Sequence, residues 1–292
     1  MDNRQNHSNA SSEFAAISPA IAKTPIVLTI AGSDSGGGAG IQADIKAISA
    51  TGSYACSVIT ALTAQNTQGV SAVLSVNQHF IEQQLAAVFS DIAVDVVKIG
   101  MLADAATITT VAKALRKYKP RQIVLDPVMV ATSGDVLLAN EAISALITQL
   151  FPIATVITPN IPEAMALLGR KGEDTPNSDQ QSLSICRELL ELGCQSVLLK
   201  GGHQTGANST DFWLSNENQH NFTAPRIATK NTHGTGCTLS SAIASYLAQG
   251  QDLQTAISNA KAYISHAISH ADELHIGKGS GPVHHFWAHA NK

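Results

Sequence analysis

Short β-branched runs alternate with segments of helical periodicity along most of this chain, and no other feature constrains its fold as strongly. Between the apolar runs, apolar residues recur at three- and four-residue steps, as at Ile41, Ile45 and Ile48. Near-continuous apolar strands separated by amphipathic helices predict an α/β fold, in which helices cover both faces of a mostly parallel sheet. The six apolar runs are residues 26–32, 55–62, 94–100, 122–127, 154–159 and 196–202.

The pattern is weaker at the two ends of the chain. Residues 1–23 are polar and lack periodicity, which predicts a disordered tail. After Gly202 come two shorter strand-like runs, 209–214 and 220–227, followed by two long amphipathic helices. No Pro-, Gly- or Ser-rich linker and no internal repeat divides the remainder, so residues 24–292 are predicted to form a single domain.

Charge and cysteine usage exclude several classes of function. Eighteen Lys and Arg against 22 Asp and Glu give a net charge of −4, whereas a nucleic-acid or anionic-membrane partner requires a basic face. No apolar run reaches the roughly 18 residues that span a bilayer, and the N-terminus lacks the pattern of a secretory signal. The four cysteines form no CxxC pair. We therefore expect a cytoplasmic protein with free thiols and no nucleic-acid or membrane partner.

The turns that follow the strands are the candidate ligand-binding segments, because open parallel sheets bind ligands beyond the carboxyl ends of their strands. The first turn, residues 32–40, reads GSDSGGGAG, and its glycines allow backbone N–H groups to approach an anion or a ring. It lacks the Gly-Lys-Ser/Thr ending of a Walker A loop and the GxGxxG spacing of a dinucleotide site. An oxidoreductase is therefore disfavoured, while a simple glycine turn stays open as an alternative.

The second and fourth of the six strands also end in polar side chains. Gln65 follows the run 55–62, and an amide that both donates and accepts suits the edge of a heterocycle, although a polar strand end is more often just a turn. Asp126 ends the run 122–127, where a carboxylate serves either to hold Mg²⁺ through water or to cap the next turn.

Two further turns carry charged residues. Asn160 and Glu163 form an N-x-x-E at the opening of a predicted helix, where a carboxylate is equally well explained as a helix cap. Lys200 ends a buried strand and needs an anion, for which phosphate is a natural candidate.

Residues 231–238, NTHGTGCT, give the strongest local signal because they open directly into the amphipathic helix 239–249. Small residues there expose N–H groups at the positive end of the helix dipole, which predicts an anion hole. At this place the pKa of Cys237 is predicted to fall toward the thiolate, whereas the other three cysteines lie inside apolar segments. His266 and His270 have metal-ligand spacing but no HExxH glutamate, which favours solvated helix positions over zinc.

Seven motifs along the chain resemble those of the hydroxymethylpyrimidine/phosphomethylpyrimidine kinases of thiamine biosynthesis, within the ribokinase-like superfamily. The resemblance covers roughly residues 24–287 and includes the ending GKGSGPVHHF. It implies a ribokinase-like three-layer αβα sandwich with a mostly parallel central sheet, and a homodimer. It also implies ATP- and Mg²⁺-dependent phosphorylation of 4-amino-5-hydroxymethyl-2-methylpyrimidine to its monophosphate and then its diphosphate. The motifs are AGSDSGGGAGIQADIKA, ITALTAQNTQGV, VKIGML, VLDPVM, TPNIPEA, LLKGGH and NTHGTGCTLSSAIA.

The resemblance implies a role for each matching site residue. In the substrate pocket Gln65 reads the pyrimidine, and the other pocket residues are Asp44, Gly32, Thr63, Met101 and Val128. Mg²⁺ is implied at Asp126 and Glu163 through water. The nucleotide and phosphate groups are implied to meet Asn160, Glu163, Lys200 and Thr235. The catalytic residues are implied to be Cys237, Lys200, Gly234 and Gly236.

One position departs from the superfamily pattern, since ribokinase has a G-A-G-D whose aspartate serves as base, and this chain has Gly-Thr-Gly-Cys. A thiolate is a poor base for a primary alcohol, so stabilisation of charge by Cys237 with late proton transfer is favoured over early deprotonation. Two other functions stay open on the same motifs. A pyridoxal or pyridoxine kinase shares the phosphate motifs, and a non-catalytic sensor is disfavoured because the phosphate-handling residues are retained.

Overall fold

A single nine-stranded sheet passes through the computed structural model, which describes residues 23–129, 140–170, 176–202 and 206–289. The strand order is β3-β2-β1-β4-β5-β6-β7-β8-β9. In this order the six strands from β2 to β7 are parallel to one another. At one edge β3 pairs antiparallel with β2, and at the other β8 pairs antiparallel with β7 and β9. The strands are β1 (Ile26–Asp34), β2 (Tyr54–Asn66), β3 (Gly69–Ser75), β4 (Val96–Ile99), β5 (Gln122–Leu125), β6 (Val156–Ile157), β7 (Ser196–Leu199), β8 (Asn208–Ser215) and β9 (Gln219–Pro225).

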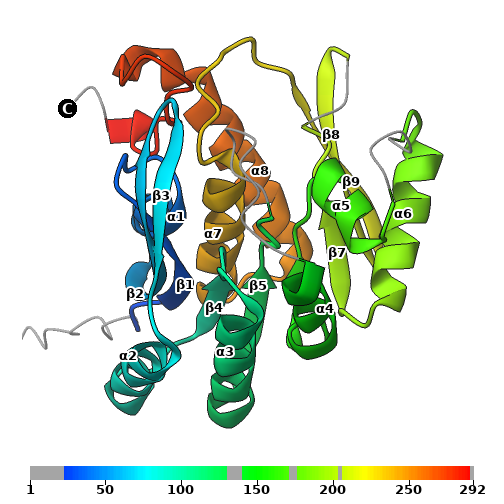
Figure 1. Ribbon diagram of the computed structural model, residues 1–292. Coiled ribbons are helices and arrows are strands. Elements are labelled where there is room, and N and C mark those ends of the chain that lie inside the picture. The colour runs from blue at the N-terminus through cyan, green and yellow to red at the C-terminus, as the bar shows by residue number, and fades with distance from the viewer. Residues whose placement is uncertain (1–22, 130–139, 171–175, 203–205, 290–292) are drawn as a thin grey trace, which may run out of the picture.

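Two layers of helices enclose the sheet, as Figure 1 shows. Successive strand residues alternate between the layers: Val96 packs with the first helix layer and Val97 with the second. The predicted αβα sandwich with a mostly parallel sheet is therefore confirmed. The first layer contains α1 (Gly40–Ala50), α7 (Thr235–Ala248) and α8 (Leu253–Ser269). The second contains α2 (Gln78–Asp91), α3 (Ala105–Tyr118), α4 (Asn140–Gln149), α5 (Ile161–Leu167) and α6 (Asp179–Glu191).

The predicted ends of the first two strands are wrong. β1 continues to Asp34 and β2 to Asn66, and the sequence pattern does not predict β3 at all. β3 is an edge strand whose last five residues are exposed, so it lacks the apolar alternation on which a strand prediction depends. The predicted tail lies outside the described residues apart from Lys23. No helix among the described residues is long and apolar enough to cross a membrane.

The parallel strands bring distant parts of the chain together at one edge of the sheet. The carboxyl ends of β1, β2, β5 and β7 meet there, and α7 begins at the same edge. Residues separated by more than 150 positions, such as Gln65 and His233, thereby come into contact. This edge is where the sequence predicts the ligand site.

Candidate active site

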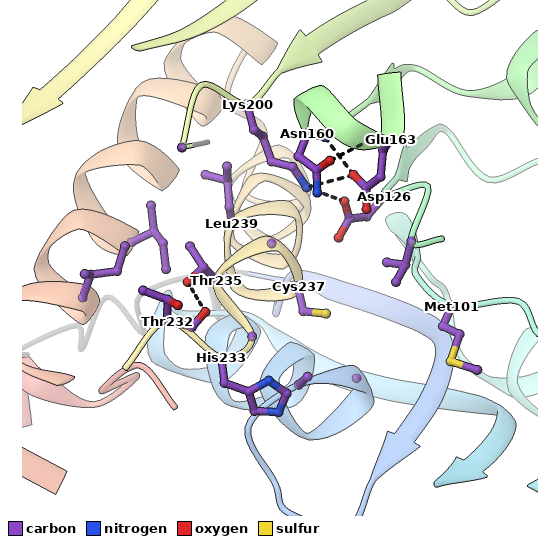
Figure 2. A pocket seen from close by; sticks show the side chains of 18 of the residues that line it. Met101, Asp126, Asn160, Glu163, Lys200, Thr232, His233, Thr235, Cys237 and Leu239 are labelled. Atoms are coloured by element: carbon purple, nitrogen blue, oxygen red, sulfur yellow. Dashed lines mark hydrogen bonds and ion pairs between the residues drawn. The ribbon is translucent and has the colours of Figure 1, made fainter. Parts of the chain in front are cut away.

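A cavity of about 680 Å³ opens at the carboxyl edge of the sheet. With one exception, Asp44, every site residue predicted from the sequence lines it, and Figure 2 labels most of those with charged or polar side chains. The predicted residues in the lining are Gly32, Thr63, Gln65, Met101, Asp126, Val128, Asn160, Glu163, Lys200, Gly234, Thr235, Gly236 and Cys237.

Lys200 supplies a fixed positive charge at one end of this cavity. Its Nζ lies 2.8 Å from Oδ1 of Asp126 and 3.9 Å from Oε2 of Glu163. Burial lowers the pKa of Lys200, but the two carboxylates outweigh burial and raise the pKa above its usual value. Thr158 donates a hydrogen bond of 3.0 Å to the same oxygen of Asp126, which fixes this carboxylate below the lysine.

Asn160 and Glu163 form a capping box at the start of α5. Asn160 accepts from the Glu163 N–H, Glu163 accepts from the Asn160 N–H, and both bonds measure 2.8 Å. The interpretation of Glu163 as a helix cap is therefore confirmed, and Glu163 lines the cavity as well. Burial and the nearby Asp126 raise the pKa of Glu163 to about 7, against the lowering effect of Lys200. Two carboxylates thus share one lysine.

Helix α7 begins at the cavity with Gly234 at its N-cap, and within the described part of the chain no side chain caps this helix start. The backbone of Gly234 has φ of +79°, and a Cβ there would lie 1.8 Å from the carbonyl oxygen of Gly38. A Cβ on Gly236 would approach Nζ of Lys200 to 3.2 Å. Glycine at these positions therefore lets the helix N-terminus, the first glycine turn and the lysine lie together. This geometry suits a phosphate group.

The predicted thiolate character of Cys237 is wrong. Burial raises the pKa of the Cys237 thiol to about 11, and Asp44 and Asp126 add to the rise while Lys98 opposes it. The helix dipole is outweighed because the thiol is enclosed together with two carboxylates. At neutral pH the side chain that faces the cavity is a protonated thiol, which is a weak donor.

Asp44 does not touch the cavity, which contradicts its expected contact with the pyrimidine. Its side chain is completely buried, and its oxygens accept from Thr29 at 2.6 Å and from Ser241 at 2.7 Å. The ammonium of Lys98 lies 2.8 and 2.9 Å from the two oxygens. Asp44 therefore belongs to a buried polar network below the start of α7.

Lys98 is a residue that the sequence reasoning missed. It is fully buried in the middle of β4 and pairs with Asp44. A lysine inside the apolar run 94–100 is the signal that could have identified it, because a buried ammonium requires a carboxylate partner.

The sequence reasoning also missed the pair formed by Asp34 and His233. Nε2 of His233 lies 2.9 Å from Oδ2 of Asp34, at the carboxyl end of β1. Asp34 also accepts the backbone N–H groups of Gly36, Gly38 and Ala39. Burial raises the pKa of Asp34, but His233 and these N–H groups outweigh burial and lower the pKa overall. The sequence predicts that the N–H groups of this glycine turn face a ligand, but three of them donate to the Asp34 side chain of the same turn.

The histidines near the C-terminus have structural contacts. His266 and His270 stack on the ring of Trp287 at centroid distances of 4.6 and 5.5 Å. Among the described residues, no group of three or more His, Cys, Asp or Glu side chains converges in a way that could hold a metal ion.

The fold and this site define a class of protein. A parallel αβα sandwich with a lysine, paired carboxylates and an open helix N-terminus at one sheet edge is typical of a small-molecule kinase of the ribokinase-like kind. Residues 34–284 match the family model described as phosphomethylpyrimidine kinase. The chain belongs to this family.

Curated relatives support the same family over nearly their whole length. The chain is 50% identical over 263 residues to the hydroxymethylpyrimidine/phosphomethylpyrimidine kinase of Salmonella typhimurium, an alignment that covers 89% of this chain and 97% of that protein. It is 49% identical, with the same coverage, to the protein of that name from Escherichia coli.

Two solved structures resemble this chain to different degrees in backbone and in sequence. A phosphomethylpyrimidine kinase from Clostridium difficile aligns with a TM-score of 0.73 at 45% identity, covering 84% of this chain and 100% of that one. The Staphylococcus aureus pyridoxal kinase, solved with AMP-PCP and pyridoxal, aligns with a TM-score of 0.83 at 30% identity, covering 92% and 96%. The TM-score is thus higher for the pyridoxal kinase, whereas sequence identity is higher for the phosphomethylpyrimidine kinase.

Proposed function

We propose that this chain phosphorylates the hydroxymethyl group of 4-amino-5-hydroxymethyl-2-methylpyrimidine with ATP and then transfers a second phosphoryl group to the monophosphate. The observation that carries this proposal is that one cavity is lined by Lys200, the start of α7 and Gln65 together. The names of the relatives support the substrate, and the kinase family supports ATP as donor.

The pyrimidine is proposed to bind at the end of the cavity formed by β1 and β2. Gln65 presents an amide to the ring edge, and Thr63 supports that amide with a contact of 3.0 Å. Met101 and Val128 are proposed to form apolar walls. A Cβ on Gly32 would lie 3.2 Å from the sulfur of Met101, so glycine there leaves space for the ring.

Phosphoryl transfer is proposed to take place beside the ring, at the start of α7, since His233 next to Gly234 already contacts Gln65. Lys200 offsets the negative charge that spreads over the transferring group, and Gly234 and Gly236 offer it N–H groups at the start of α7, while the Thr235 N–H donates to the Thr232 carbonyl. The neutral thiol of Cys237 donates to the same group, and the substrate proton leaves late in the transfer. Asn160 orients Glu163 through the capping box.

The residues present are suited to Mg²⁺. Asp126 and Glu163 share one lysine, which leaves an excess of negative charge, and hard oxygen donors are the ligands that Mg²⁺ prefers. Mg²⁺ commonly binds through one or two carboxylates together with waters and phosphates, so a third protein ligand is not required. Bound there, Mg²⁺ would neutralise charge on the nucleotide phosphates.

The activity is tested by mass spectrometry after incubation of the protein with ATP, Mg²⁺ and the aminopyrimidine alcohol, with pyridoxine in a parallel reaction. We expect the monophosphate and then the diphosphate of the pyrimidine. Phosphorylated pyridoxine alone would transfer the assignment to the vitamin B6 kinases, which the structural similarity to pyridoxal kinase makes the second candidate. No product in either reaction would instead support the sensor hypothesis.

We further propose a homodimer that functions in the cytoplasm. The outer strand β3 and its neighbour β2 expose large apolar side chains, among them Leu74 and Val73, which supports an apolar contact between two copies. The four cysteines are free, which supports a reducing compartment. Sedimentation of the wild type and of Leu74→Lys tests the dimer, and a monomeric wild type would contradict it.

A further inference from the structure

Gln65 has two neighbours that compete to determine which way its amide faces. Nε2 of Gln65 lies 3.4 Å from Nε2 of His233, and Oε1 of Gln65 lies 3.0 Å from the hydroxyl of Thr63. The two ends of an amide have nearly the same size, so the hydrogens carried by the neighbours decide which end faces which partner.

His233 carries a hydrogen on the nitrogen that faces Gln65. This nitrogen lies 2.9 Å from Oδ2 of Asp34, a carboxylate that also accepts backbone N–H bonds of 2.7, 3.0 and 2.8 Å. An acceptor-only carboxylate at that distance requires an N–H from the ring, whether the imidazole is neutral or charged. The ring is also confined, because the Cβ position of Gly38 lies only 2.3 Å from its Cδ2 atom.

Thr63 can accept a hydrogen from the amide. Its hydroxyl proton has the carbonyl oxygen of Ser33 as a partner at 3.0 Å, so its lone pairs are available to an amide N–H. The amide nitrogen therefore has an acceptor in Thr63 and only a competing N–H in His233. With the amide turned over, its nitrogen donates to Thr63, and its oxygen shares the His233 N–H that Asp34 accepts.

We propose that the Asp34–His233 pair positions Gln65 so that its oxygen faces His233 and its nitrogen faces Thr63, and that this order selects 4-aminopyrimidines over their 4-oxo counterparts. One N–H and one lone pair of the amide remain for the ring edge. A 4-aminopyrimidine presents a donor amine beside an acceptor ring nitrogen, whereas the 4-oxo tautomer presents an acceptor oxygen beside a ring N–H. A fixed amide matches one order and opposes the other, and the proposed substrate makes the 4-aminopyrimidine the matched ring. This inference rests on the proposed function, because it requires the pyrimidine to meet Gln65.

His233 is thus a positioning residue, and its test is a ratio of specificities. The ratio of kcat/KM for the 4-amino alcohol to that for its 4-oxo analogue is measured in the wild type and in His233→Phe, which keeps a ring against Gly38 but removes the N–H. We expect about 100-fold or more in the wild type and less than about tenfold in the variant, because a free amide turns to suit either ring. A merely structural role would lower both kcat/KM values together and leave the ratio unchanged.

Two further variants complete the experiment. Thr63→Val removes the acceptor in a side chain of equal size and should also lower the ratio, which covers the case that His233→Phe does not fold. Lys46→Gln is the matched control, since Lys46 holds the same glycine turn through a 2.8 Å bond to the Gly37 carbonyl without contacting Gln65. Its ratio should stay at the wild-type value.

The outcomes separate this inference from the proposed function. A ratio retained in the folded His233 or Thr63 variant overturns the inference, as does an equal fall in Lys46→Gln. A wild type that phosphorylates both pyrimidines equally overturns it while leaving the proposed function intact. A wild type that phosphorylates neither pyrimidine refutes the proposed function, and the inference with it.

Discussion

Nζ of Lys98 lies 2.8 Å from Oδ1 of Asp44, and both side chains are completely excluded from solvent. The pair connects β4 to α1 directly below the start of α7, where Ser241 donates a 2.7 Å bond to the same carboxylate. Burial lowers the pKa of Lys98, but the charge of Asp44 and of other nearby groups outweighs burial and raises the pKa overall. A buried ion pair with hydrogen bonds to its carboxylate therefore lies beneath α7.

Removal of Lys98 alone should lower the free energy of unfolding more than removal of Lys98 and Asp44 together. Lys98→Met is expected to lower the free energy of unfolding by about 3–5 kcal/mol, because it leaves Asp44 buried without its counter-ion. The double variant Lys98→Met with Asp44→Leu should recover most of that loss. Urea unfolding of the wild type, both single variants and the double variant measures the coupling. Losses that simply add would show that the two charges do not depend on each other.

Gly38 and Gly202 form a matched pair for testing the glycine turn. Gly38→Ala should destabilise the protein by about 1–3 kcal/mol and raise the KM for the pyrimidine, because the added Cβ would lie 2.3 Å from the ring of His233. Gly202 lines the cavity, and no atom of the described residues lies within 4 Å of its Cβ position, so Gly202→Ala should change stability by less than about 0.5 kcal/mol. Equal losses in unfolding experiments on the two variants would contradict this packing argument.

Cys237 should act as a donor and not as a base. Because burial raises the pKa of its thiol to about 11, the proton stays on sulfur throughout the range pH 7–9. Cys237→Ala is therefore expected to lower kcat about tenfold, less than the roughly 100- to 1,000-fold loss for a strong transition-state donor because a thiol is a weak donor, and Cys237→Ser should restore most of it. Near-full turnover in Cys237→Ala would remove this residue from the mechanism.

The pH profile gives an independent measurement on the same residue. A donor thiol predicts a kcat that does not rise between pH 8 and pH 9, above the range in which Glu163 loses its proton, since the required form of the thiol is the protonated one. A thiolate base predicts a kcat that increases with pH across that range. High activity in Cys237→Asp would likewise favour the base.

The fold could be predicted because the alternation of strands and helices recurs along most of the chain. The position of the site followed from topology, since the polar residues at the ends of parallel strands meet at one edge. β3 could not be predicted, because an exposed edge strand needs no apolar alternation. The contact between Asp34 and His233 could not be predicted either. These residues are 199 positions apart, and no local sequence pattern indicates a contact over that separation.

Two errors at the site have different physical origins. Asp44 shares a helix face with Ile41 and Ile48, both of which are buried, so the spacing already indicated that Asp44 points toward the core. The pKa of Cys237 was not predictable from its position at a helix start. It depends on carboxylates that come from two other elements of the fold, and on how completely they and the thiol are enclosed.

His285, in the GPVHH segment, should make the protein sensitive to mild acid. Its buried ring lies 2.9 Å from the hydroxyl of Thr238, and its backbone oxygen accepts from Tyr263 at 2.8 Å. Burial and the nearby charge of Lys46 lower the pKa of His285 to about 3. Between pH 6.5 and pH 3 the unfolded chain therefore binds a proton at this position that the folded protein excludes, and stability is lost as the pH falls.

The expected effect is an additional loss of up to about 1.4 kcal/mol for each pH unit below 6.5. Urea unfolding of the wild type and of His285→Asn at pH 7.5 and pH 5.5 measures it, since asparagine retains a polar group near Thr238 but does not titrate. The wild type should lose more stability between the two pH values than the variant does, whatever their difference at pH 7.5. His266→Asn is the control, because His266 is exposed beside Trp287 and should leave the difference unchanged. An equal loss in the wild type and in His285→Asn would show that His285 is not the group whose protonation destabilises the fold.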